Sequence, residues 1–296
     1  MHTAAMTEAA QTFDRLRSLL FAPAVRPDMI PKLPGSGADA VVIDCEDATP
    51  PGAKAEGRQH ARELAPKIAG QGALVFVRVN AVATAWFEDD VREGLSGTLA
   101  GIVVPKLDQL DQVETVARAL SEAGRPGLPV LAGIETALGV AEARGLLAHP
   151  RVAAAYFGAE DFIADMGGVR TEGNQEVLYA RSQVALAGRL AGVPTLDQVV
   201  TDFRNDEAFE REVREARALG YRGKLCIHPR QVALANAGFV PSAEEVEHAR
   251  RLLDAFTRAS EAGVAAIEFD GQMVDEPLAA RARQTLAAAD AEEENG

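Results

Sequence analysis

Three carboxylates follow two short apolar runs in the middle of the chain. Glu135 follows the run VLAGI, and Glu160 and Asp161 follow the run VAAAYF. If both runs are parallel strands of one sheet, these carboxylates meet at its carboxyl edge. Oxygen ligands on rigid elements suit a hard divalent cation, and Mg2+ commonly takes one or two protein carboxylates and leaves its other positions to water and substrate. The pattern therefore predicts a Mg2+ site at the edge of a sheet.

Further polar side chains follow other apolar runs in the same way. They are Asp44, Glu46, Asp47, Arg78, Asn80, Lys106 and His228. In a barrel of parallel strands the reacting groups lie at the carboxyl ends of the strands. Several acids around one mouth repel one another unless a cation or an arginine compensates. The set therefore favours a metal, and it contains Arg78 as a clamp for an anionic substrate, because a guanidinium binds carboxylates through two parallel hydrogen bonds.

Simpler interpretations of the main candidates stay open at this point. Glu135 and Asp161 each fit a helix N-cap or a first-turn acid, which the helix dipole favours. Metal binding becomes the better interpretation when the two lie on adjacent strands. Arg78 could instead be the structural partner of Asp44 or Glu46.

The remaining candidates have weaker claims to a chemical role. Lys106 could form a Schiff base, but a lysine beside this many acids is expected to stay protonated and to pair with one of them. His228 precedes a proline and is expected to be structural. Cys45 and Cys226 lie inside predicted strands without neighbours of metal-binding or redox spacing, so we expect two buried, reduced thiols.

Strand and helix patterns alternate through eight units. The predicted strands cover residues 18–22, 40–44, 73–79, 101–104, 130–134, 152–157, 193–199 and 224–227, and the clearest helices cover 54–68, 86–94, 108–122, 176–191 and 207–219. Eight such units close a (β/α)8 barrel. An open doubly wound sheet is the alternative. The barrel is favoured because no glycine-rich dinucleotide motif follows the first strand and because polar residues follow nearly every strand.

The pattern changes after Ala237. A charged amphipathic helix over 241–262, a short strand and turn in IEFDGQMVDEP, a last helix over 278–289 and an acidic, disordered tail AEEENG are predicted. The expected organisation is a catalytic barrel over residues 1–238 and a C-terminal extension over 239–296 that acts as a lid or in oligomerisation.

Composition limits the class of protein. The chain has 296 residues, of which 47% are hydrophobic and 25% charged, as in a soluble globular protein. A formal net charge of -14 argues against nucleic acid and anionic membranes as partners. No apolar run is long enough to span a bilayer, and the N-terminus lacks the order of a signal peptide. A cytoplasmic protein is expected.

Seven blocks in order carry a resemblance to a known family. They are RSLLFAPAVRPDM, DCEDATPPGAK, VRVN, IVVPK, GIET, GAEDFIADMGG and GYRGKLCIHPRQV. The chain resembles the citrate lyase beta-subunit family of the HpcH/HpaI aldolase superfamily, which also holds malyl-CoA and citramalyl-CoA lyases. One departure from the family pattern is FAPA, in which Ala24 replaces a glycine. If that glycine lets a thioester or phosphate approach the backbone, the replacement affects how the thioester is held.

The resemblance implies a TIM barrel and a set of roles for the strand-end residues. Glu135 and Asp161 would hold Mg2+, and Arg78 would bind the carboxylate of an oxo-acid such as oxaloacetate, glyoxylate or pyruvate. A homo-oligomer is implied, with a trimer favoured. FDGQMVDEP resembles a C-terminal family segment whose last aspartate, here Asp275, reaches the active site of a neighbouring subunit as acid or base.

The acid-base assignments follow from that resemblance. Asp275 is the first candidate, and Glu46 or Asp47 would support it near the metal. Asp275 also fits a helix N-cap before Glu276 and Pro277, and both roles are compatible.

The implied activity is a Mg2+-dependent cleavage or condensation of a 3-hydroxyacyl thioester of the citryl, malyl or citramalyl type. The products of cleavage are an oxo-acid and an acyl thioester carried by CoA or an acyl-carrier protein. Two alternatives stay open. One is an aldolase of free hydroxy-oxo-acids without a thioester, and the other is a subunit of a citrate lyase complex that depends on an acyl-carrier protein.

Overall fold

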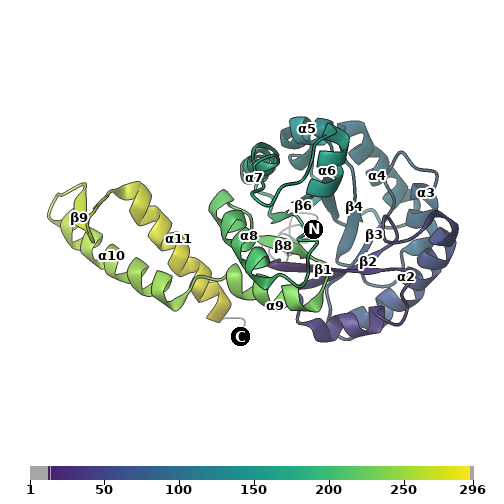
Figure 1. The fold of residues 1–296 in the computed structure, drawn as a ribbon, viewed down its shortest axis with the longest axis horizontal. Coiled ribbons are helices and arrows are strands. Elements are labelled where there is room, and N and C mark those ends of the chain that lie inside the picture. The colour runs from purple at the N-terminus through teal and green to yellow at the C-terminus, as the bar shows by residue number, and fades with distance from the viewer. Residues whose placement is uncertain (1–12, 14, 294–296) are drawn as a thin grey trace. The chain divides into compact units, whose positions relative to one another are not determined.

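Eight parallel strands close into a barrel in the order of the chain (Figure 1). The computed structural model describes residue 13 and residues 15–293. The strands are β1 (Ser18–Pro23), β2 (Ala40–Asp44), β3 (Val75–Arg78), β4 (Gly101–Val104), β5 (Val130–Ile134), β6 (Val152–Phe157), β7 (Thr195–Asp197) and β8 (Gly223–Cys226). The predicted (β/α)8 barrel is therefore confirmed, and the open doubly wound sheet is excluded.

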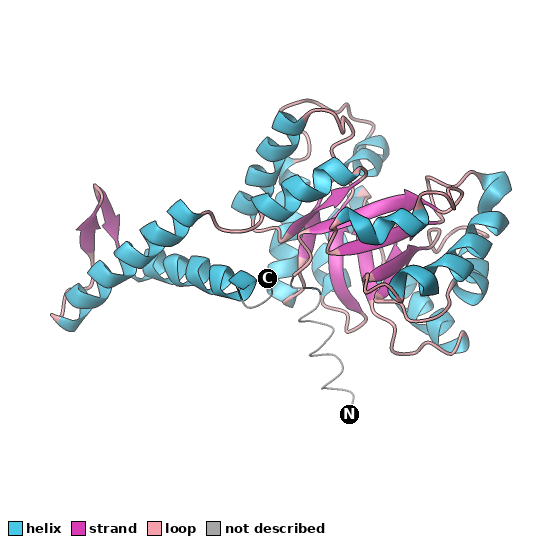
Figure 2. Ribbon diagram, turned by 90° about the horizontal axis from the view of Figure 1, so that it is seen from below, coloured by secondary structure: helices cyan, strands magenta, loops and turns pink. Residues whose placement is uncertain are grey.

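Helices lie around the outside of these strands (Figure 2). They are η1 (Ile30–Ser36), η2 (Pro51–Ala53), α2 (Lys54–Ala69), α3 (Phe87–Asp89), the π-helical turn η3 (Asp90–Gly94), α4 (Leu110–Glu122), α5 (Ala137–Leu147), α6 (Ala159–Met166), α7 (Leu178–Ala191), α8 (Asp206–Leu219) and α9 (Pro229–Gly238). All five residues of β2 are buried, as expected for a strand covered on both faces. Cys45 and Cys226 are buried and free, as predicted.

The interior of the barrel is filled by apolar side chains. The buried cluster consists of Phe13, Leu16, Leu19, Ala40, Val42, Phe76, Val103, Leu131, Ala154, Tyr156, Leu196 and Leu225. Such layers of side chains make the centre of the barrel a packed core rather than a pore. Many of the polar groups lie at the carboxyl ends of the strands, where the chain leaves the core, and a few, such as Lys224 in β8, are buried within the strands.

A second compact unit begins at Ala237 and has its own apolar core. It contains α10 (Ala243–Glu261), the antiparallel pair β9 (Ile267–Phe269) and β10 (Gln272–Val274), and α11 (Glu276–Glu293). The helices of the predicted C-terminal extension are thus present. No helix of the described residues is long and apolar enough to cross a membrane.

Several predicted boundaries were wrong in detail. The final helix continues to Glu293 instead of ending at residue 289, so only residues 294–296 of the predicted disordered tail lie outside the described residues. The seventh strand is shorter than 193–199, because only three residues pair with the neighbouring strands. The helix α9 was missed, although Pro229 at its start is a residue well suited to a first helical turn.

Two glycines within helices allow a test of how closely the helices pack on the barrel. A Cβ on Gly188 in α7 would lie 2.5 Å from Thr195 Cγ2 and 2.8 Å from the Val193 carbonyl oxygen, whereas a Cβ on Gly145 in α5 would meet nothing within 4 Å. We expect Gly188→Ala to lower the free energy of unfolding by roughly 1–3 kcal/mol through overpacking. Gly145→Ala should raise it by up to about 1 kcal/mol, because alanine has the higher helix propensity.

Urea denaturation of both variants beside the wild type measures the two effects. Equal stability changes in the two variants would contradict the close packing of α7 on β7.

Candidate active site

One ion pair with two hydrogen bonds joins the ends of β2 and β3. Asp44 and Arg78 are register partners at the last positions of these strands. Arg78 donates from Nε to Asp44 Oδ1 at 2.7 Å and from Nη2 to Asp44 Oδ2 at 2.6 Å. Burial by itself would lower the pKa of Arg78, but the charge and the hydrogen bonds of Asp44 outweigh it and raise that pKa well above its ordinary value. Arg78 is therefore a permanent cation at the carboxyl edge of the barrel, paired as one of the simpler interpretations anticipated.

The loop after β2 brings two more acids to this edge. Glu46 Oε2 lies 3.2 Å from Arg78 Nη1, and Lys54 fixes the loop by donating to the carbonyl oxygens of Cys45 and Glu46 at 2.9 and 2.8 Å. Burial, which outweighs the nearby cations, raises the pKa of Glu46 to about 7. Glu46 can therefore gain or lose a proton near neutral pH.

The pKa of Asp47, the next residue, is shifted in the opposite direction. Burial would raise its pKa, but a hydrogen bond with Glu46 and the charges of Lys106 and Arg78 outweigh burial and lower it. Two neighbouring carboxyl groups whose pKa values are pushed apart suit different protonation states at one pH.

Lys106 is the second cation of the cluster and follows β4. Its ammonium Nζ lies 2.5 Å from Glu46 Oε1, 3.3 Å from Asp47 Oδ2 and 3.3 Å from Asp161 Oδ1. Burial opposes the charge on this ammonium, but Glu46 and the other acids outweigh it and raise the pKa of Lys106. The predicted role in charge balance is therefore what the contacts show, and a neutral amine for a Schiff base is disfavoured.

Glu135 lies at the end of β5 and is 2% exposed. Its Oε1 accepts a hydrogen bond from the hydroxyl of Tyr156 in β6, and its Oε2 accepts one from the backbone N–H of Lys106 at 3.2 Å. Burial raises the pKa of Glu135, while Arg78 and the Tyr156 hydrogen bond oppose the rise. A buried carboxylate of this kind requires compensation by nearby cations.

Asp161 and Glu160 lie in the first turn of α6, directly after β6. Asp161 reaches the Lys106 ammonium, whereas Glu160 pairs with Arg170 at 2.9 Å. The register of β5 on β6 pairs Ile134 with Phe157, so Glu135 and Asp161 come from adjacent strand ends, as the Mg2+ hypothesis requires.

Two other strand-end residues have structural partners. Asn80 donates from Nδ2 to the Cys45 carbonyl oxygen at 3.0 Å and to Asp90 Oδ2 at 2.5 Å. The ring of His228 stacks on Phe203 at a centroid distance of 4.8 Å, and its Nδ1 accepts a hydrogen bond from the Arg230 N–H. The structural role expected for His228 agrees with these contacts.

Asp275 lies in the second compact unit, between β10 and α11. Its carbonyl oxygen accepts from Ala279 N at 3.0 Å, as in the first turn of a helix. Its Oδ1 is buried without a hydrogen-bond partner among the described residues. The cluster of Glu46, Asp47, Arg78 and the proposed metal ligands lies in the first compact unit.

Ala24, the departure from the family pattern, lies just after β1. It is fully buried, and its N–H donates to the Asp44 carbonyl oxygen at 2.9 Å. Among the described non-glycine residues only Lys106, Asn174 and Asp270 have a positive φ, so the backbone at Ala24 does not require glycine. The alanine instead ties the start of this loop to the strand end that carries Asp44.

The donor set fits Mg2+ in kind and in charge. Among the described residues, no group of three or more His, Cys, Asp or Glu side chains is arranged to hold a metal ion. Mg2+ does not need such a cage, because it is usually bound by one or two carboxylates with water and substrate. The carboxylates of Asp44, Glu46, Asp47, Glu135 and Asp161 outnumber the two side-chain cations that contact them, Arg78 and Lys106. Glu135 and Asp161 therefore suit a hard cation.

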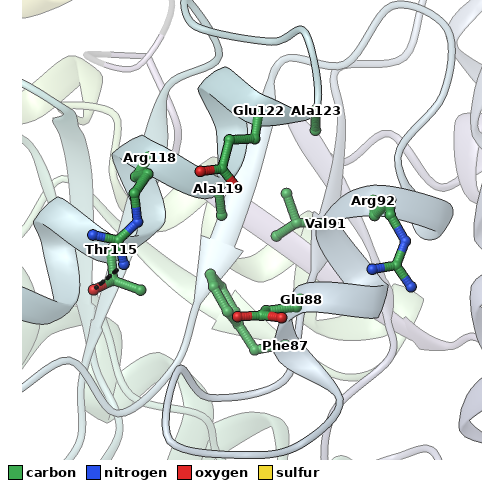
Figure 3. Close-up of a pocket in the computed structure, with 9 residues that line it drawn as sticks. All are labelled: Phe87, Glu88, Val91, Arg92, Thr115, Arg118, Ala119, Glu122 and Ala123. Atoms are coloured by element: carbon green, nitrogen blue, oxygen red, sulfur yellow. Dashed lines mark hydrogen bonds between the residues drawn. The ribbon is translucent and has the colours of Figure 1, made fainter.

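A separate hollow lies on the outside of the barrel, between η3 and α4 (Figure 3). It has a volume of about 160 Å3 and is lined by Phe87, Glu88, Val91, Arg92, Thr115, Arg118, Ala119, Glu122 and Ala123. None of the strand-end residues contributes to it. The strand-end cluster, and not this hollow, is therefore the candidate active site.

Two contributors to the cluster were not predicted from the sequence. The sequence pattern indicates Tyr156 only as part of an apolar strand, and Lys54 only as the start of a helix and the last residue of the block DCEDATPPGAK. A tyrosine in the run VAAAYF is a usable signal, because a buried tyrosine hydroxyl usually finds a hydrogen-bond partner.

Comparisons with known proteins agree with this fold. The family model "HpcH/HpaI aldolase/citrate lyase" matches residues 17–229. A citrate lyase subunit beta-like protein of Deinococcus radiodurans is 53% identical over 275 residues, covering 92% of this chain and 96% of that protein. A (3S)-malyl-CoA thioesterase of Cereibacter sphaeroides is 33% identical, covering 93% and 95%. The crystal structure of protein CitE from Mycobacterium tuberculosis in complex with magnesium, acetoacetate and coenzyme A has a TM-score of 0.79 and 31% identity, covering 92% and 97%.

The raised pKa of Glu46 makes stability depend on pH in a defined direction. The folded state retains a proton on Glu46 that the unfolded state releases, because the pKa is about 7 instead of 4.5. Stability therefore falls as the pH rises through this window. Relative to Glu46→Gln, the wild type should lose about 3 kcal/mol of unfolding free energy between about pH 4 and about pH 8.

Urea denaturation in the presence of a chelator at both pH values measures this difference. Asp47→Asn is the matched control: the pKa of Asp47 is lowered, so the comparison with this variant should not show the same fall. A constant difference between the wild type and Glu46→Gln across the range would contradict the assignment.

Proposed function

The chain belongs to the HpcH/HpaI aldolase/citrate lyase family, and from this we propose that it is a Mg2+-dependent carbon-carbon lyase acting on a 3-hydroxyacyl thioester. The substrate would be of the citryl, malyl or citramalyl type, and the products an oxo-acid and an acyl thioester. The observation that carries the proposal is the strand-end cluster, in which Lys106 contacts two acids from adjacent strand ends, Glu135 and Asp161, and also pairs with Glu46 beside Arg78. The magnesium and coenzyme A bound by the related CitE structure support it.

Glu135 and Asp161 would hold the Mg2+. When bound, the ion would supply positive charge to the hydroxyl and carboxylate oxygens of the substrate, which lowers the pKa of the hydroxyl. The protein's part is to hold the two carboxylates in place. Lys106 does this for both, through its ammonium to Asp161 and its backbone N–H to Glu135.

Arg78 would orient the substrate. Its Nε and Nη2 are held by Asp44, which fixes the plane of the guanidinium and directs Nη1 toward Glu46. A substrate carboxylate would therefore meet a guanidinium that has no freedom to turn. Such positioning aligns the bond to be broken and removes part of the entropic barrier.

Cleavage needs one group to take a proton and one to give a proton. The substrate hydroxyl loses its proton, its oxygen forms the carbonyl of the oxo-acid, and the electrons of the broken C–C bond pass to the thioester as an enolate, which is then protonated on carbon. Glu46 is suited to the first step, because its pKa is about 7 and its buried Oε2, which forms an ion pair with Arg78 Nη1 at 3.2 Å, accepts no hydrogen bond. Asp47 would support it by keeping the negative charge nearby.

Asp275 is the proposed acid-base partner, supplied by a neighbouring subunit of a homo-oligomer. Its buried, unpartnered Oδ1 is a carboxylate oxygen for which the described chain supplies no hydrogen-bond donor. In this proposal the C-terminal unit, from residue 239 in the expected organisation, serves as lid and oligomer contact. A trimer is the favoured assembly, and CoA is the favoured carrier over an acyl-carrier protein because coenzyme A is bound in the related CitE structure.

Thioester hydrolysis is a second candidate, favoured by one observation. A relative that is 33% identical is named a (3S)-malyl-CoA thioesterase. The two candidates differ in their products from malyl-CoA, since a lyase releases glyoxylate and acetyl-CoA, whereas a thioesterase releases free malate and CoA.

Isosteric variants of the two metal ligands test the proposed lyase. Glu135→Gln and Asp161→Asn should each lower Mg2+-dependent cleavage of malyl-CoA and citramalyl-CoA by about a hundredfold or more, because each removes a charged ligand. Chromatography of the products separates oxo-acid and acyl-CoA from free hydroxy acid and CoA. Glu160→Gln is the matched control and should retain wild-type activity, since Glu160 pairs with Arg170.

Wild-type activity of Glu135→Gln or Asp161→Asn after chelation and return of Mg2+ would refute the ligand assignment. Release of hydroxy acid without oxo-acid would replace the lyase by the thioesterase. Activity on free hydroxy-oxo-acids alone would favour the aldolase without a thioester, and a requirement for a co-purified acyl-carrier protein would favour a citrate lyase complex.

Mixing inactive subunits tests whether Asp275 acts across an interface. Asp275→Asn and Glu135→Gln subunits, unfolded together and refolded in equal amounts, should regain roughly a quarter of wild-type activity if each site combines residues of two subunits. Glu135→Gln is preferred to an Arg78 variant, because loss of Arg78 would leave the buried Asp44 without its partner. No recovery in confirmed mixed oligomers would contradict a site shared between subunits.

A further inference from the structure

A buried hydrogen bond inside the barrel joins a tyrosine to one of the two proposed metal ligands. The hydroxyl of Tyr156, the penultimate residue of β6, donates to Glu135 Oε1. Tyr156 is 1% exposed and Glu135 is 2% exposed, so water does not compete for this hydrogen bond. The contact joins the carboxyl end of β5 to β6, the strand that leads into Asp161.

The backbone on both sides of this contact leaves room for it. A Cβ on Gly133 would lie 2.5 Å from the Tyr156 hydroxyl oxygen and 2.9 Å from the Pro105 Cα. A Cβ on Gly158 would lie 2.7 Å from Glu135 Cγ. Any larger residue at either position would displace the tyrosine or the carboxylate. The pair is therefore closely fitted, and neither side chain can change its orientation without moving the other.

The two oxygens of Glu135 have different donors. Oε1 accepts from the Tyr156 hydroxyl, and Oε2 accepts from the Lys106 N–H at 3.2 Å. The tyrosine and the lysine backbone thus hold the carboxylate from two sides. Partners behind a ligand that fix its orientation commonly change metal affinity by about 10–100-fold when they are removed.

We propose that Tyr156 is a positioning residue for a divalent cation at Glu135. Its hydroxyl fixes Oε1 and thereby the plane of the carboxylate, so that the affinity of the protein for Mg2+ depends on a group that does not touch the ion. This inference rests on the proposed assignment of Glu135 as a metal ligand and goes beyond it by naming the residue that aims the ligand.

A second buried tyrosine offers a matched control. Tyr221 is 3% exposed, and its hydroxyl donates to the backbone carbonyl oxygen of Arg181 at 2.8 Å. Tyr156→Phe and Tyr221→Phe each remove one buried hydroxyl that donates one hydrogen bond. Only the first removes a donor to Glu135. A general cost of losing a tyrosine hydroxyl would therefore be the same for both.

Binding of Mn2+ to the full-length, metal-free protein measures the effect without any turnover. Free Mn2+ is followed by electron paramagnetic resonance, and Mg2+ affinity is obtained by competition. Tyr156→Phe should raise the Kd for both ions by about 10–100-fold. Tyr221→Phe should leave the Kd within about twofold of the wild type, because the Tyr221 hydroxyl donates to a backbone carbonyl oxygen and not to a proposed ligand. Glu135→Gln, measured in parallel, should abolish binding at this site.

The outcomes distinguish this inference from the proposed function. If Glu135→Gln abolishes binding and Tyr156→Phe binds like the wild type, Tyr156 has no positioning role and the metal site stands. If Tyr156→Phe and Tyr221→Phe weaken binding equally, the effect is general and the inference is refuted. If Glu135→Gln binds like the wild type, the metal assignment fails and the inference falls with it.

A measurement on the unmutated site covers the case in which Tyr156→Phe does not fold. The chain has three tyrosines, so 3-fluorotyrosine labelling gives three fluorine resonances, which Tyr179→Phe and Tyr221→Phe assign by elimination. Tyr179 is 76% exposed. Addition of Mg2+ should shift the Tyr156 resonance and leave the other two unchanged, and an unshifted Tyr156 resonance would overturn the inference.

Discussion

The ion pair of Arg78 with Asp44 is the contact on which the strand-end cluster depends. It brings a guanidinium and a carboxylate out of water at the ends of two neighbouring strands, with hydrogen bonds of 2.7 and 2.6 Å. Buried charges are tolerated only when they are paired and hydrogen-bonded. Because Asp44 alone already balances Arg78, the acids Glu46, Glu135 and Asp161 must either retain a proton or be compensated by other cations.

Lys106 provides part of this positive charge, and its backbone adopts an uncommon conformation. Its ammonium contacts Glu46, Asp47 and Asp161, while its backbone N–H donates to Glu135. To do so, Lys106 adopts a φ of 54°, an uncommon conformation for a residue with a side chain. Strained backbone of this kind is concentrated at functional sites. One lysine cannot neutralise all these acids, and a divalent cation would complete the balance.

The sequence predicted the architecture well because its strands are buried on both faces. Runs such as AVVID in β2 have no polar alternation, and the polar residues at the ends of such runs include Asp44, Arg78, Glu135 and Asp161. Which of these strand-end side chains contact one another does not follow from the apolar runs. Whether Arg78 faces Asp44 or a substrate depends on strand register, which places Asp44 opposite Arg78.

Other features were beyond the reach of sequence patterns. In the sequence, Tyr156 is one more residue of an apolar strand. Its hydroxyl can reach Glu135 only because Gly133 and Gly158 leave space for the two side chains. The proposed acid-base role of Asp275 would require a neighbouring subunit, and it follows from the family resemblance and not from local periodicity. Local periodicity therefore predicts which elements form, whereas long-range packing determines which charges meet.

The most direct test of the account is to locate a bound metal. A crystal soaked with Mn2+ and an oxo-acid, measured at the manganese absorption edge, should show an anomalous peak roughly 2 Å from a carboxylate oxygen of both Glu135 and Asp161. The carboxylate of the oxo-acid should lie within hydrogen-bonding distance of Arg78 Nη1. An anomalous peak elsewhere, or none in crystals that bind the oxo-acid, would contradict the assignment of this cluster as a Mg2+ site.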